Sequence, residues 1–149
     1  MQLSDYFDPD LLVHDLKGTT KTAVLKEMLV PLQKKISALD LERAHSILLE
    51  RESLGSTGIG DGVAIPHGKM EELSDIFVVV ARSENGIDFD ALDAKPCRIF
   101  FLVLAPENVA GLHLRILAQI SRLLKDPGFR QDFLQVENRE GLARLLGSI

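Results

Sequence analysis

The sequence predicts an α/β fold, in which a single domain holds a mixed, partly parallel β-sheet flanked by helices on both faces. Residues 76–81 form a continuous apolar run, and residues 98–104 are apolar after Arg98; both segments are rich in Val, Ile or Phe, which is typical of strands covered on both faces. Segments with the apolar spacing of helices stand before and after these runs, and this alternation is typical of layered α/β domains. The 149 residues fit one domain over the whole chain, 1–149.

The N-terminal part of the chain predicts an edge strand and a helix. Residues 11–13 form a short apolar run that fits a strand at the edge of the sheet. Thr19 or Thr20 can cap a helix over 21–36, because a hydroxyl oxygen can accept a hydrogen bond from a free N–H group of the first turn. Pro31 lies inside the helical pattern and has no N–H. We therefore expect it to kink this helix or to end it at the preceding residue.

The middle of the chain predicts a second helix and several short strands. Asp40 can cap this helix, which then carries Arg51 near its C-terminal end. Residues 63–65 read as a short strand. The Asn-Gly pair at 85–86 is a strong signal for a two-residue hairpin turn, so we expect it to lead from the first buried strand into a strand at 87–89.

Three helices are predicted after the second buried strand. The first is expected over 112–124. Its predicted core-facing residues are His113, Leu117, Ile120 and Leu124. Pro-Gly at 127–128 separates it from a short helix near 129–134. Asn138 can cap a last helix that ends near Leu146.

Composition excludes several classes of protein. The formal net charge is −5 and no dense basic patch is present, which argues against binding of nucleic acid. The sequence contains no apolar run near the roughly 20 residues that cross a membrane. Its first residues are acidic and lack an export signal. Cys97 is the only cysteine, so no intrachain disulfide can form. These features predict a cytoplasmic protein that does not insert into membranes.

The segment from Gly55 to Lys69 concentrates residues suited to chemistry. It holds five glycines, two hydroxyl side chains, one aspartate and His67 within 15 residues. A neutral imidazole is a nucleophile near pH 7 and can accept a phosphoryl group. Pro66 restricts the residue before it to extended angles, so we expect His67 to lie in an exposed loop after a strand. The alternative is a turn histidine with no chemical role.

Two further side chains are candidates for the same site. Arg51 carries a planar, permanently charged fork that matches phosphate oxygens. Its alternative role is a surface ion pair with Glu50 or Glu52. His113 opens a predicted helix on its core-facing side, where it could hydrogen-bond a phosphoryl group shared with His67. Its alternative is a partly buried histidine that is paired with backbone.

Backbone and hydroxyl donors of the glycine segment could form a phosphate nest. The candidates are Ser56, Thr57 and Gly58, although a purely structural role would also account for several residues of this segment. The spacing does not match a nucleotide-binding P-loop. Zinc needs three or four ligands, and the single cysteine falls in a predicted buried strand, so the sequence predicts neither a metal nor a cofactor.

The residue order of this region resembles a known active-site segment. Residues 48–52 (LLERE), 55–60 (GSTGIG) and 64–69 (AIPHGK) are similar to those of enzyme IIA (EIIA) proteins of the fructose/mannitol type, also called type 2. These proteins belong to the bacterial phosphoenolpyruvate-dependent phosphotransferase system (PTS). The free-standing length and the GSTGIG segment resemble most the nitrogen-regulatory branch.

The resemblance implies an α/β sandwich and a role for each candidate residue. His67 would receive a phosphoryl group, on its Nε2 atom, from the phosphohistidine of a phosphocarrier protein (HPr or its nitrogen-type paralogue). Arg51 and His113 would steady that group. In the regulatory branch the phosphorylated state controls binding to target proteins. One alternative is a sugar-specific EIIA that passes the group to EIIB for sugar uptake. A third possibility, of another class, is a protein-binding module that is not phosphorylated.

Overall fold

The computed structural model describes residues 2–149, and in them a six-stranded mixed sheet forms the centre of the molecule. The strands lie in the order β1-β5-β6-β3-β2, and β4 also pairs with β6. The bounds are β1 (Phe7–Val13), β2 (Gly58–Gly60), β3 (Val63–Ala64), β4 (His67–Lys69), β5 (Phe77–Ile87) and β6 (Cys97–Ala105). β1 runs parallel to β5, whereas β5 and β6 are antiparallel. The predicted mixed sheet is thus confirmed.

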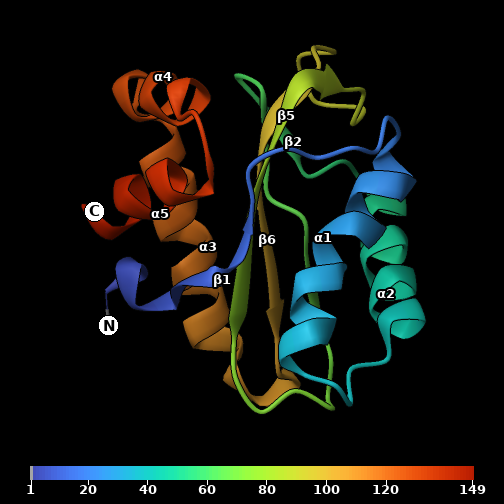
Figure 1. Cartoon of the computed structure of the whole chain (residues 1–149). Coiled ribbons are helices and arrows are strands. Elements are labelled where there is room, and N and C mark those ends of the chain that lie inside the picture. Colours follow the sequence, from blue (N-terminus) through green and yellow to red (C-terminus); the bar gives the residue numbers. More distant parts are fainter. Residues whose placement is uncertain (1) are drawn as a thin grey trace.

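Helices cover both faces of this sheet (Figure 1). The helices α1 (Lys21–Lys35) and α2 (Leu41–Ser53) lie on one face. The other face is covered by α3 (Ala110–Leu124), α4 (Pro127–Gln135) and α5 (Arg139–Gly147). Two short 3-10 helices, η1 (Leu3–Tyr6) and η2 (Glu107–Val109), precede β1 and α3. Among residues 2–149, no helix has the length and apolarity that crossing a bilayer demands.

Alternation along β6 explains its continuous apolar sequence from Ile99 to Ala105. Phe100, Leu102 and Leu104 pack in the core under α1 and α2. The residues between them, Phe101 and Val103, pack in the second core under α3 to α5. Because successive side chains of a strand point to opposite faces, a strand between two helical layers must be apolar at every position.

The helix caps are those that the sequence predicts. The Thr20 side chain accepts a hydrogen bond from the Ala23 N–H (3.1 Å), and Asp40 caps α2 in the same way. Asn138 caps α5. Pro31, however, does not end α1, which continues to Lys35. The proline removes only one backbone hydrogen bond, and the fully buried face of α1, which includes Leu32, holds the helix together on both sides of it.

The hairpin expected at 85–86 is wrong. β5 continues through these residues to Ile87, and the connection to β6 follows it instead. Arg82 pairs with Ile99 and Ile87 pairs with Cys97, so four residues of β5 face one residue of β6. Gly86 has a φ of +84° there, and its N–H donates to Ser83 Oγ (3.1 Å). The Asn-Gly pair thus forms a bulge and not a reversal of the chain.

Two helices also differ in detail from the prediction. On α3 the buried residues are His113, Ile116, Ile120 and Leu124. Leu117, expected to face the core, is only half-buried. α4 begins two residues earlier than expected because Pro127 occupies its first turn, where the missing N–H costs nothing.

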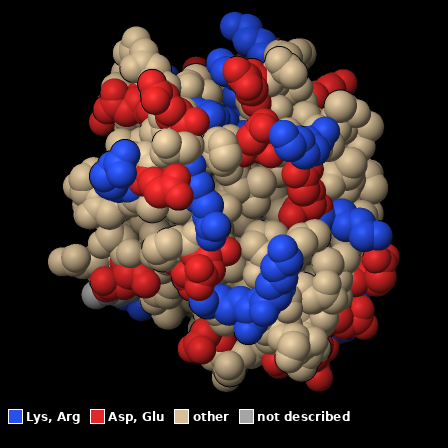
Figure 2. Space-filling model, in the orientation of Figure 1, with Lys and Arg blue, Asp and Glu red and all other residues tan. Residues whose placement is uncertain are grey.

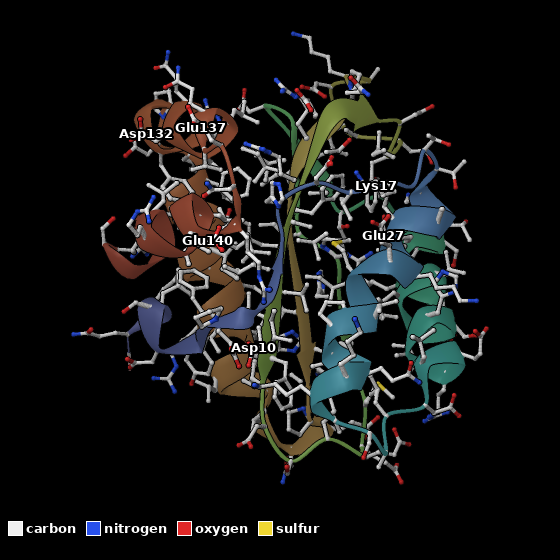
Figure 3. The ribbon with its side chains drawn as sticks, in the orientation of Figure 1. Asp10, Lys17, Glu27, Asp132, Glu137 and Glu140 are labelled. Atoms are coloured by element: carbon white, nitrogen blue, oxygen red, sulfur yellow. The ribbon has the colours of Figure 1, made fainter. Side chains whose placement is uncertain are left out.

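Charged side chains bridge the free edge of β1. Lys35 of α1 forms ion pairs with Asp8 (2.8 Å) and Asp10 (3.3 Å). From the opposite side, Arg139 of α5 donates to the Pro9 carbonyl (3.1 Å). Figure 3 shows Asp10 on β1 between the two helical layers. On the face seen in Figure 2, basic and acidic side chains are interspersed.

α2 lies directly on β4, and the contact requires a glycine. A Cβ atom at Gly68 would lie 2.7 Å from Ile47 Cγ2, far inside van der Waals contact. The close approach brings the last turn of α2, which carries Arg51, near the strand that carries His67. The glycine after His67 therefore sets the spacing of the two elements.

We expect Gly68→Ala to lower the free energy of unfolding by about 1–3 kcal/mol, because the added methyl group overpacks this contact. Urea denaturation measures the change. Gly111→Ala is the matched control, since a Cβ at that helical position meets nothing within 4 Å. Equal stability of the Gly68→Ala variant and the wild type would contradict the assigned contact.

Candidate functional site

The sequence suggested that His67 lies in a loop, but in the structure it is the first residue of β4. Its backbone pairs with Val103 of β6, and its side chain is partly exposed. β3 and β4 both lie along one side of β6, and Pro66 stands between them. Pro66 cannot donate to the sheet, but its carbonyl still accepts from the Val103 N–H (2.9 Å). The strand therefore continues, and His67 stands on a rigid element.

A backbone contact selects the tautomer of His67. Its Nδ1 lies 2.9 Å from the Ile65 carbonyl oxygen. A carbonyl can only accept a hydrogen bond, so Nδ1 carries the proton in the neutral ring. The lone pair is then on Nε2, which is the ring atom able to act as a nucleophile.

His113 lies beside His67. The two ring centroids are 6.0 Å apart and the planes meet at 78°. His113 comes from the first turn of α3 and is only 3% exposed. Its Nε2 is buried and has no hydrogen-bond partner among residues 2–149. The expected alternative, a histidine paired with backbone, does not account for this atom. A buried polar atom without a partner is costly, and a ligand group at this site would supply one.

Burial keeps both rings neutral near pH 7. It is the main cause that lowers the pKa of His67, and the Arg51 charge lowers it further, against the opposing effect of the Ile65 hydrogen bond. Burial is the main cause that lowers the pKa of His113 to about 4, with smaller contributions from His67 in its protonated form and from the Lys69 charge. His67 is thus unprotonated at Nε2 at the pH where transfer would take place.

The lowered pKa of His113 gives a pH dependence of stability. The unfolded chain takes up a proton at the ordinary pKa of 6.5, whereas the folded chain does so only at about 4. Stability is therefore complete above about pH 6.5 and is lost as the pH falls toward 4, by about 3 kcal/mol for a shift of this size. Urea denaturation between pH 7 and pH 4 measures the loss. His113→Gln should flatten the curve, and an unchanged curve in this variant would contradict the assignment.

Arg51 approaches the site from the last turn of α2. Its Nη1 donates to the Gly55 carbonyl (2.9 Å), and its charge acts on the pKa of His67. Among residues 2–149 it forms no ion pair with Glu50 or Glu52, the partners of the alternative interpretation. The guanidinium is therefore not neutralised by a carboxylate and can face an anion.

The structure pairs the donors of the glycine segment internally. Ser56 Oγ donates to the Phe89 carbonyl (2.6 Å) and accepts from the Gly58 N–H (3.0 Å). The hydroxyl and the N–H of Thr57 both donate to the Glu52 carboxylate. Phosphate binding by these three residues stays a prediction, and it would require these bonds to break.

Some residues near the site were not singled out from the sequence. Glu52 is buried and organises the segment that follows α2. Leu54, Leu92 and Leu114 are 81%, 77% and 67% exposed. Leu54 follows α2 directly and Leu114 follows His113, so their place next to the candidate residues was the available signal. Among residues 2–149 no cluster of metal-ligating side chains is found.

Comparison with known proteins places the chain in a family. Residues 5–148 match the family model described as the phosphoenolpyruvate-dependent sugar phosphotransferase system, EIIA 2. A nitrogen regulatory protein of Bradyrhizobium diazoefficiens is 40% identical over 126 residues, which cover 85% of this chain and 82% of that protein. A PTS fructose-specific EIIA component of Haloferax volcanii is 39% identical over 110 residues, or 74% of this chain and 71% of that protein.

The fold agrees with a solved relative. The crystal structure of the nitrogen regulatory protein IIA-Ntr from Neisseria meningitidis superposes with a TM-score of 0.89 at 30% sequence identity. The match covers 97% of this chain and 98% of that one. A mixed sheet between two helical layers, a family model over nearly the whole chain and relatives of both kinds lead to one conclusion. The chain belongs to the EIIA type 2 family of the phosphoenolpyruvate-dependent phosphotransferase system.

Proposed function

We propose that the protein accepts a phosphoryl group on His67 Nε2 from the phosphohistidine of a phosphocarrier protein and acts in regulation. The observation that supports this most is the contact between Nδ1 and the Ile65 carbonyl, which leaves the Nε2 lone pair free. Beside His67, His113 adds a buried ring nitrogen that has no hydrogen-bond partner within residues 2–149.

The proposed step exchanges one phosphorus–nitrogen bond for another. His67 Nε2 forms a bond to phosphorus as the bond to the donor imidazole breaks, and the donor ring keeps that electron pair. Because the bond that forms and the bond that breaks both join phosphorus to an imidazole nitrogen, the free-energy change of the transfer is small and the transfer is reversible. What the protein supplies is position and fixed charge: the Arg51 fork faces the phosphoryl oxygens, and His113 contacts one of them.

The exposed leucines suit a docking partner. Leu54, Leu92 and Leu114 could cover an apolar area on a phosphocarrier and exclude water during transfer. Leu92 is tied to the glycine segment by a hydrogen bond from its N–H to the Gly58 carbonyl (3.0 Å). The partners we propose are therefore the phosphocarrier, HPr or its nitrogen-type paralogue, and a regulatory target in the cytoplasm.

The second candidate function is transfer onward to EIIB for sugar uptake. The fructose-specific relative favours it, whereas the nitrogen regulatory relatives favour regulation. Loading the protein and then adding a fructose-type EIIB separates the two. Rapid transfer to EIIB would support sugar uptake, and retention of the phosphoryl group would support regulation.

The direct test is incubation with phosphoenolpyruvate, enzyme I and a phosphocarrier, followed by mass spectrometry of peptides at neutral pH. We expect one acid-labile phosphoryl group, located on His67. A chain that binds the phosphocarrier but takes up no phosphoryl group would be the protein-binding module considered above, and the proposal would be wrong.

A further inference from the structure

We infer that Glu52 is a positioning residue that holds Arg51 and His67 in register with each other, with Thr57 and Lys21 as its partners. This inference rests on the proposed phosphotransfer function. Glu52 touches neither the nucleophile nor the reacting group. Its effect on the positions of these groups is transmitted by hydrogen bonds, and its negative charge also acts directly on His67, whose pKa it raises.

Glu52 is a buried carboxylate, and both of its oxygens have hydrogen-bond or ion-pair partners. It is 8% exposed. One oxygen accepts from the Thr57 N–H (3.1 Å) and from Lys21 Nζ (2.9 Å), and the other accepts from the Thr57 hydroxyl. A carboxylate is stable at such a depth only when it is paired and hydrogen-bonded, so these three donors are held firmly in return.

From Thr57 a chain of backbone bonds leads to His67. The Thr57 carbonyl accepts from the Ile65 N–H (3.0 Å). The Ile65 carbonyl in turn accepts from His67 Nδ1 (2.9 Å). Glu52 therefore holds Thr57, and the Thr57 carbonyl holds the Ile65 peptide. The Ile65 carbonyl then keeps the proton on His67 Nδ1, so that Nε2 carries the lone pair.

A second, shorter path leads from Glu52 to Arg51. The Glu52 carbonyl accepts from the Gly55 N–H (3.1 Å), and the Gly55 carbonyl accepts from Arg51 Nη1 (2.9 Å). The turn after α2 is thus tied at Gly55 and again at Thr57. The tie at Gly55 uses the Glu52 backbone and the tie at Thr57 uses the Glu52 side chain, so the carboxylate fixes the far end of the same turn.

Lys21 fastens the same segment from the opposite side. Its side chain is 17% exposed, and its Nζ lies 4.7 Å from the centre of the Phe89 ring. The Phe89 carbonyl accepts from Ser56 Oγ (2.6 Å). The first turn of α1, the last turn of α2 and the segment before β6 therefore meet at one buried carboxylate.

The test compares variants of matched shape. Glu52→Gln keeps the volume but removes the charge that binds Lys21. Thr57→Val removes one hydroxyl, and Thr57→Ser keeps it. Glu50→Gln is the control, because Glu50 lies on the same helix but is exposed. Single-turnover transfer from a phosphorylated phosphocarrier gives the maximal rate and the half-saturating concentration.

We expect Glu52→Gln to lower the maximal rate by about 10²-fold, because small displacements of reacting groups cost this much. The half-saturating concentration should stay constant, because Glu52 is buried away from any docking partner. Thr57→Val should lower the rate less, Thr57→Ser should restore it, and Glu50→Gln should leave it unchanged. A wild-type rate in both folded Glu52→Gln and folded Thr57→Val would overturn the inference.

The ring nitrogens of His67 give a readout that needs no transfer. Nitrogen NMR of the unphosphorylated wild type should show the proton on Nδ1, and Thr57→Val should populate the other tautomer while Thr57→Ser does not. Absence of phosphorylation in the wild type would refute the proposed function alone. An unchanged tautomer in Thr57→Val would refute the positioning role alone. If Glu52→Gln does not fold, the two Thr57 variants still decide.

Discussion

His67→Ala is expected to abolish phosphorylation by a phosphorylated phosphocarrier, while the variant still folds. No other imidazole can take its place: His113 is 3% exposed, with its Nε2 buried, and the remaining histidines, His14 and His45, lie outside the site. Loss of the nucleophile removes the covalent step itself, so the effect is complete and not merely a slower reaction. The measurement is incorporation of acid-labile phosphate, with circular dichroism and urea denaturation to verify the fold.

The matched control for this variant is His14→Ala. The His14 backbone carbonyl accepts from Arg82 Nε (3.1 Å), and a substitution to alanine keeps that carbonyl. His14→Ala should therefore be phosphorylated at the wild-type rate. Acid-labile phosphate retained by His67→Ala would show that another residue is the acceptor.

Arg51→Ala is expected to slow transfer by about 10²- to 10³-fold, the usual cost of removing one donor aimed at developing negative charge. Arg51→Lys keeps the charge but loses the planar fork, so it should recover only part of the rate, leaving it about 10-fold below wild type. Single-turnover kinetics measure both variants.

The control for Arg51 lies on the same helix. Arg43 is exposed, lies in the first turn of α2, whereas Arg51 lies in the last, and forms an ion pair with Glu72 (3.1 Å). Arg43→Lys should transfer at the wild-type rate. If Arg51→Lys also did so, the fork geometry would not matter, and if Arg51→Ala did so, the arginine would have no part in the reaction.

The layers of the fold could be predicted because their signals are local. Residues 76–81 and 99–104 are apolar at every position, as a strand between two helical layers requires. Thr20 and Asp40 mark helix starts through their own hydrogen bonds. Proximity of His67 and His113 in space was also suggested by sequence, through the family resemblance and the position of His113 at a helix start.

Other features depended on contacts between distant residues. Asn85–Gly86 has the local chemistry of a turn, but pairing of Ile87 with Cys97 extends β5 beyond it. His67 falls in a strand because β6 offers a free edge beside Pro66, which no local signal shows. The same is true of Ser56 and Thr57: their donors look available in the sequence, and only the fold brings the Phe89 carbonyl and Glu52 to them.

The anchoring of β4 has a consequence for how a phosphorylated form would be told from an unphosphorylated one. The backbone at His67 is tied to β6, the strand at the centre of the molecule, and α2 lies against Gly68 with no space between them. Loading and unloading of the imidazole should therefore leave the chain trace unchanged. The phosphorylated form would then differ from the unphosphorylated form in the added charge, about −1.5 to −2 at neutral pH, and not in its backbone conformation. A target that distinguishes the two forms by this charge needs a cationic group opposite His67, and its preference for the phosphorylated form should weaken as the salt concentration rises.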